Sequence, residues 1–83
     1  MSAKEMFEEL GFIKQDNEKL EIIRYIKTID STIPTEFWHI DFHKGEHIYQ
    51  SYVTSSLIDR DYNLGIFFEW QKAINKQVEE LGW

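Results

Sequence analysis

Residues 36–42 read EFWHIDF, a segment in which large apolar side chains alternate with polar ones. Successive side chains of a β-strand point to opposite faces, so Trp38, Ile40 and Phe42 share one face. The other face carries three side chains of mixed character: Phe37, His39 and Asp41. This alternation predicts a strand in a sheet that is covered on one side only.

Two further segments, Leu20–Ile29 and Glu46–Thr54, are rich in Ile, Tyr and Val and are bounded by polar turn residues. Their composition predicts one strand before and one strand after the central segment. We expect residues 30–35 to connect the first two strands. Residues 55–64 are expected to form a surface loop, followed by at most a short extra strand near Gly65.

The turn between the second and third strands sets their register. We expect residues 43–45 to form a three-residue hairpin loop with Gly45 in the left-handed conformation. This loop pairs Ile40 with Ile48, so that apolar residues meet, and it places Tyr52 on the covered face of the sheet. A two-residue loop would instead set an apolar residue opposite a charged one.

Helix signals mark both ends of the chain. Ser2 and Glu5 have the spacing of a capping box, and Gly11 is placed to stop the helix, so a first helix covers about residues 3–10. A second apolar stripe at helical spacing ends before Gly82. Its members are Phe67, Trp70, Ile74, Val78 and Leu81. The start of this second helix stays open, because no good capping residue precedes it.

Together these elements predict an α+β fold in the order α-β-β-β-α. The N-terminal and C-terminal helices pack on one face of an antiparallel sheet of three to four strands. A chain of 83 residues is too short to divide into two cores, so residues 1–83 form a single domain.

Composition narrows the classes of function. Fifteen acidic against nine basic residues give a net charge of −6, which disfavours binding to nucleic-acid phosphates. We find neither a signal peptide nor a segment of membrane-spanning length, and therefore expect a cytoplasmic protein that does not enter the membrane. The chain has no cysteine, and so no thiolate nucleophile and no disulfide.

The sequence carries no recognisable catalytic motif. The serines stand outside any nucleophile elbow, and the four glycines are isolated and form no phosphate-binding loop. We therefore expect a non-enzymatic protein without a cofactor.

One constellation suits metal chemistry. His39 and Asp41 lie on the polar face of the predicted central strand, with His43 at its end and His47 across the hairpin. Imidazole and carboxylate groups bind zinc or nickel. A metal-binding protein or metal-dependent enzyme that uses these residues is an alternative function, although polar residues are also ordinary on the solvated face of an antiparallel strand.

Aromatic residues that are hard to bury on a one-sided sheet indicate an interaction surface. Phe37 lies on the outer face, and beside Tyr49 it would form an apolar patch fit for a partner. Tyr52 and the terminal Trp83 are further interface candidates, since aromatic side chains dominate interface hot spots. Trp83 could also cross a dimer interface, so homodimerisation stays open.

The edge of the strand Leu20–Ile29 offers a second route to a partner. Unpaired backbone groups on an edge strand can accept a strand from another chain. Its charged residues, Arg24 and Lys27, could equally serve to protect that edge.

The chain carries MFEELG at residues 6–11 and AINKQVEELGW at residues 73–83. In these segments it resembles small proteins encoded in phages and prophages of low-GC Gram-positive bacteria. The resemblance implies a phage-derived protein in a bacterial cytoplasm. That group has no assigned activity, so the resemblance implies no catalytic residue.

The leading hypothesis is a non-enzymatic, phage-derived protein-interaction module that binds an unidentified host or phage protein. Metal binding at the histidines is the first alternative. The second is an acidic nucleic-acid mimic that occupies the binding site of a basic protein.

Overall fold

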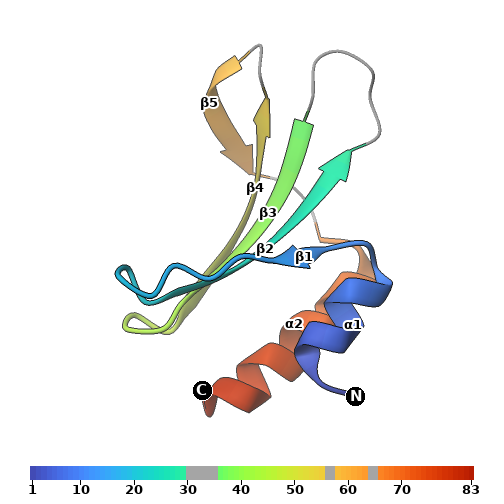
Figure 1. Cartoon of the computed structure of the whole chain (residues 1–83), viewed down its shortest axis with the longest axis vertical. Helices are drawn as coiled ribbons and strands as arrows, with labels where there is room; N and C mark the ends of the chain where they lie inside the picture. The colour runs from blue at the N-terminus through green and yellow to red at the C-terminus, as the bar shows by residue number, and fades with distance from the viewer. Residues whose placement is uncertain (30–35, 56–57, 64–65) are drawn as a thin grey trace.

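The computed structural model describes residues 1–29, 36–55, 58–63 and 66–83, and it confirms the predicted α+β fold (Figure 1). The elements in chain order are α1 (Ala3–Glu9), β1 (Ile13–Lys14), β2 (Ile22–Ile29), β3 (Glu36–His43), β4 (Ile48–Ser55), β5 (Ile58–Asn63) and α2 (Phe68–Leu81). The strands form one antiparallel sheet in the order β1-β2-β3-β4-β5. Both helices lie side by side on the same face of this sheet. The predicted connection at residues 30–35 lies outside the described residues.

The first helix begins and ends as its sequence predicts. The Ser2 hydroxyl accepts a hydrogen bond from the Glu5 N–H at 3.2 Å, and the Ser2 N–H donates to the Glu5 carboxylate at 3.1 Å. At the other end Gly11 has φ of 93°, which lets the Phe12 N–H turn back and donate to the Phe7 carbonyl at 2.9 Å. The chain therefore leaves α1 at a sharp angle and returns along the sheet.

The second helix ends by the same device. Gly82 has φ of 74°, and the Trp83 N–H donates to the Val78 carbonyl at 3.2 Å. The helix α2 begins at Phe68, and the preceding residue, Phe67, makes no side-chain hydrogen bond that caps it. Phe67 is also more exposed, at 55%, than its place in the apolar stripe predicts, although its ring stacks on Trp38.

The three predicted strands are confirmed as β2, β3 and β4, while two shorter elements differ from expectation. Residues 58–63, which the sequence assigns to a loop, form β5 as an antiparallel neighbour of β4. Backbone pairing with β4 does not require the apolar alternation on which the prediction rests. In addition β1 pairs with β2, setting Ile13 opposite Ile26, so β2 is not the edge strand that the sequence predicts.

The predicted register of the β3–β4 hairpin is wrong. The loop comprises residues 44–47 and closes with a hydrogen bond from the His47 N–H to the His43 carbonyl at 3.0 Å. The left-handed residue is His47, with φ of 57°, instead of Gly45. The Lys44 N–H also donates to the carbonyl of Glu21 at 3.0 Å, which holds this turn beside the β1–β2 turn (Figure 1).

This longer loop changes which side chains of β4 face the core. Phe42 pairs with Tyr49 and Ile40 with Ser51, so odd-numbered residues of β4 lie on the covered face. Tyr52 lies on the outer face opposite His39, contrary to the prediction that it faces inward. The outer face therefore gains an aromatic side chain that sequence reasoning places in the core.

The core is built from rings contributed by both helices and the covered face of the sheet. Phe7 of α1 stacks on Tyr25 of β2 with ring centroids 3.9 Å apart. Phe12 meets Trp70 of α2 edge-on at 5.1 Å. Aromatic pairs of this kind contribute about 0.5–1.5 kcal/mol each beyond the burial of their surface. They fix the helix layer to one side of the sheet and leave the other side open.

One buried hydrogen bond joins the sheet to α2. The Tyr25 hydroxyl donates to the side-chain carbonyl oxygen of Gln77 at 2.7 Å, and both side chains are buried. Burial raises the pKa of Tyr25 well above its ordinary value, because the charged phenolate would be poorly solvated there. The folded protein therefore holds this hydroxyl protonated as a donor.

We predict that Tyr25→Phe lowers the free energy of unfolding at pH 7 by about 1–3 kcal/mol, because the buried Gln77 acceptor loses its donor. The raised pKa stabilises the fold below the ordinary tyrosine pKa of about 10, and this contribution is lost as the pH rises above that value. The gap between wild type and variant should therefore narrow above pH 10. Urea denaturation at several pH values measures it, and a gap that stays constant would contradict the buried hydrogen bond.

Candidate functional site

The candidate site is the face of the sheet opposite the helices, which we call the helix-free face. The strand register and the alternation of side chains determine its members. From β1 to β4 they are Ile13, Ile22, Arg24, Ile26, Thr28, Phe37, His39, Asp41, His43, Ile48, Gln50, Tyr52 and Thr54.

Three apolar side chains of this face are well exposed. Ile13 of β1 is 68% exposed, Ile48 of β4 is 44% exposed and Phe37 of β3 is 38% exposed. They come from three different strands and surround a polar centre. Single exposed apolar residues are normal on a surface, so the case for a contact surface depends on the residues that lie between these three.

A hydrogen-bonded network forms the polar centre of the face. Asp41 of β3 is 2% exposed, and its carboxylate accepts two hydrogen bonds from Arg24 of β2, from Nε at 2.9 Å and from Nη2 at 3.0 Å. The Tyr52 hydroxyl of β4 donates to the same carboxylate at 2.7 Å. The bidentate geometry is the strong form of an arginine–carboxylate pair. Three adjacent strands are thereby joined through one buried anion.

The network extends to the next pair of residues on the face. The His39 ring lies parallel to the Tyr52 ring, with centroids 4.7 Å apart and an interplanar angle of 1°. Its Nε2 is 2.8 Å from the Thr54 hydroxyl. The aromatic pair therefore has a fixed orientation.

This arrangement suits an anchor better than a reactive group. Both oxygens of Asp41 accept hydrogen bonds, so the carboxylate is already occupied. Its hydrogen bonds to Arg24 also raise the pKa of the guanidinium above its ordinary value. A carboxylate held by a permanent cation and a hydroxyl has no geometry for abstracting a substrate proton.

The structure does not gather the four proposed metal ligands. His39 and His43 lie at the same face but four residues apart, about 14 Å along an extended strand. His47 lies on the helix side, where its ring stacks on Trp83 at 5.2 Å. Within the described part of the chain, no three His, Asp or Glu side chains come together as a metal site would require. Metal binding stays a hypothesis from the sequence.

The four proposed interface residues divide between the two faces. Phe37 and Tyr52 lie on the helix-free face, whereas Tyr49 lies opposite Phe42 on the helix side. Trp83 also contacts Phe42, at 6.2 Å between ring centroids. The predicted patch of Phe37 beside Tyr49 is therefore wrong, because the hairpin register places these residues on opposite faces.

Sequence reasoning does not mark Arg24 and Ile13 as members of this face. Arg24 binds Asp41 and protects no edge, since β1 covers β2. Lys27 points to the helix side, where its ammonium donates to the Leu10 carbonyl at the end of α1 at 2.7 Å. The sequence does offer one signal for Arg24, because it is a cation in a strand rich in apolar residues. Its pairing with Asp41, however, can be predicted only once the register of β2 and β3 is known.

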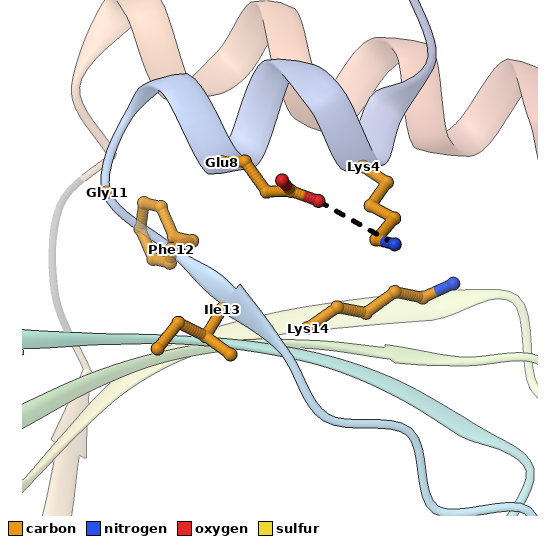
Figure 2. Close-up of a pocket in the computed structure, with 6 residues that line it drawn as sticks. All are labelled: Lys4, Glu8, Gly11, Phe12, Ile13 and Lys14. Atoms are coloured by element: carbon orange, nitrogen blue, oxygen red, sulfur yellow. Dashed lines mark ion pairs between the residues drawn. The ribbon is translucent and has the colours of Figure 1, made fainter.

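A separate hollow lies at the β1 edge of the sheet. An open cleft with a volume of about 440 Å³ lies between α1 and β1, and Figure 2 shows the residues that line it. Its lining residues are Lys4, Glu8, Gly11, Phe12, Ile13 and Lys14. The cleft shares only Ile13 with the helix-free face.

Comparison with protein-family models, curated proteins and solved structures finds no match to this chain. Among the described residues, the helices are too short or too polar to span a membrane. Any function must therefore be argued from the site itself.

We predict that replacing Arg24 and replacing Asp41 lower the free energy of unfolding by different amounts. Arg24→Met keeps the apolar stem but leaves a buried carboxylate without its cation, at a cost of about 3 kcal/mol in unfolding free energy. Asp41→Asn leaves an arginine that is about one-third exposed and can turn to water, so we expect about 1–2 kcal/mol. Urea denaturation at pH 7 measures both, and equal losses would contradict an anchoring role for the buried Asp41.

Proposed function

We propose that the chain is a non-enzymatic protein-interaction module of phage origin, which binds a host or phage protein through the helix-free face. The observation that carries this proposal is the near absence of charge on that face. From β1 to β4 its described members include one cation and one anion, Arg24 and Asp41, and these neutralise each other. The whole chain, by contrast, is 29% charged.

Such a surface has the composition of an interface centre. The central part of a protein–protein interface is depleted in charged residues and enriched in aromatic residues. Here Phe37 and Tyr52 stand among exposed isoleucines, and the guanidinium of Arg24 adds the residue type most often found with aromatics at hot spots. A mostly apolar partner surface with a hydrogen-bond acceptor opposite Arg24 would complement it.

The fixed network supports binding without rearrangement. Arg24, Asp41 and Tyr52 hold three strands together through hydrogen bonds, and His39 is stacked in place. A surface that is already ordered loses less conformational entropy when a partner binds. The resemblance of the two ends to phage and prophage proteins supports the proposed origin and a bacterial cytoplasm as the place of action.

We expect Phe37→Glu to weaken partner binding strongly, because it puts an unpaired charge on a face whose two described charges neutralise each other. Tagged wild type and variant would be incubated with a lysate of the source organism, and retained proteins identified by mass spectrometry. A partner should bind wild type at least about tenfold better than the variant. Circular dichroism and a thermal melt check that the variant is folded.

Phe68→Glu is the matched control, since Phe68 is 76% exposed on α2 and lies away from the helix-free face. This variant should keep the partner. Equal retention by all three proteins would contradict the proposed surface. Loss of the partner at high salt would instead favour an acidic mimic, whose binding is electrostatic and screened.

A further inference from the structure

The β1 edge of the sheet presents backbone groups in a defined direction. The Gln15 N–H donates to the Arg24 carbonyl at 2.6 Å, and the register sets Lys14 opposite Tyr25. In an antiparallel ladder alternate residues bond to the neighbouring strand, so the N–H and C=O of Lys14 point away from β2. Within the described part of the chain β1 is the outermost strand on that side.

The cleft of Figure 2 lies where a further strand would run. Lys4 and Glu8 of α1 form one wall, Ile13 and Lys14 of β1 form the other, and Phe12 lies between them. A strand added to β1 would lie about 4.8 Å from it and would pass alongside Lys4 and Glu8. Backbone pairing and side-chain contacts with α1 would then be available to the same segment.

The charges around the cleft favour an acidic side chain at one position. Lys14 faces the helix side, as its partner Tyr25 does, and Lys4 extends toward the same space from α1. Among the described residues, each lysine has one ion pair at the surface, Lys4 with Glu8 at 3.8 Å and Lys14 with Asp16 at 3.5 Å. Ion pairs at a protein surface are weak and exchange readily.

We propose that this edge binds an extended segment of a partner protein as an added antiparallel strand, with an Asp or Glu opposite Lys14. This inference rests on the proposed function, because it assumes that the bound segment belongs to a partner protein. The carboxylate would lie on the face that Lys14 and Lys4 share, and the backbone of Lys14 would exchange two hydrogen bonds with the added strand. A second copy of the chain pairing about Lys14 would set two lysines opposite each other, which disfavours that occupant.

Two synthetic peptides test the proposal on the isotope-labelled chain. One is acetyl-Thr-Val-Glu-Val-Thr-amide and the other has Lys in place of Glu. The Glu peptide should shift the backbone amide NMR signals of residues 12–16, and the Lys peptide should bind about tenfold more weakly. Lys14→Glu should reverse this preference. Lys76→Glu, an equal change in net charge on α2, should leave it unchanged.

Lys14→Pro tests the backbone part of the proposal. Proline is tolerated on an edge strand where the N–H points outward, so the fold should survive while binding of the Glu peptide is lost. Lys14→Gln, which keeps the N–H, should retain weakened binding.

Three results would overturn the proposal. Equal binding of the two peptides would show that Lys14 does not select an acidic side chain. Changes in the amide NMR signals of the helix-free face alone would show that the peptide binds there and not at β1. Shifts of residues 12–16 that depend on protein concentration alone would assign the edge to a second copy. None of these affects the outcome of the Phe37→Glu and Phe68→Glu comparison, so failure here and failure of the proposed function are distinguishable.

Discussion

The buried carboxylate of Asp41 is the constraint on which the rest of the sheet depends. It lies on a face that no helix covers, yet it is shielded by the side chains that bind it, Arg24 on one side and Tyr52 on the other. A slip of one residue in either neighbouring strand would turn these donors to the opposite face and leave the charge without partners. The network therefore specifies the register of β2, β3 and β4 together.

That register separates the two faces of the sheet by chemistry. On one face the aromatic core holds α1 and α2 against the sheet, through contacts such as Phe7 with Tyr25. On the other, the only described charges from β1 to β4 cancel, and exposed isoleucine and phenylalanine surround them. In a chain with a net charge of −6, the part of the helix-free face contributed by β1 to β4 is thus nearly neutral, which is the physical basis for the proposal that this face binds a partner.

Local signals in the sequence are sufficient to predict the fold class. They are insufficient to predict which residues lie on the helix-free face. The capping box at Ser2, the glycine stops at Gly11 and Gly82 and the alternation along β3 each depend on neighbouring residues, and each is confirmed. The hairpin loop depends on contacts made outside it, since the Lys44 N–H bonds to the β1–β2 turn. Its register decides the position of Tyr52, so the composition of the outer face could not be read from β4 alone. The same holds for Arg24, whose partner is 17 residues away in the chain.

The central claim is that the helix-free face binds a protein partner. The most direct test is to titrate a partner identified by affinity capture into the isotope-labelled chain and map the backbone amide NMR signals that change. The account predicts changes concentrated on β2, β3 and β4, around Ile26, Phe37 and Ile48, with little effect along the outer side of α2. Changes confined to α1 and α2, with the sheet signals undisturbed, would contradict it.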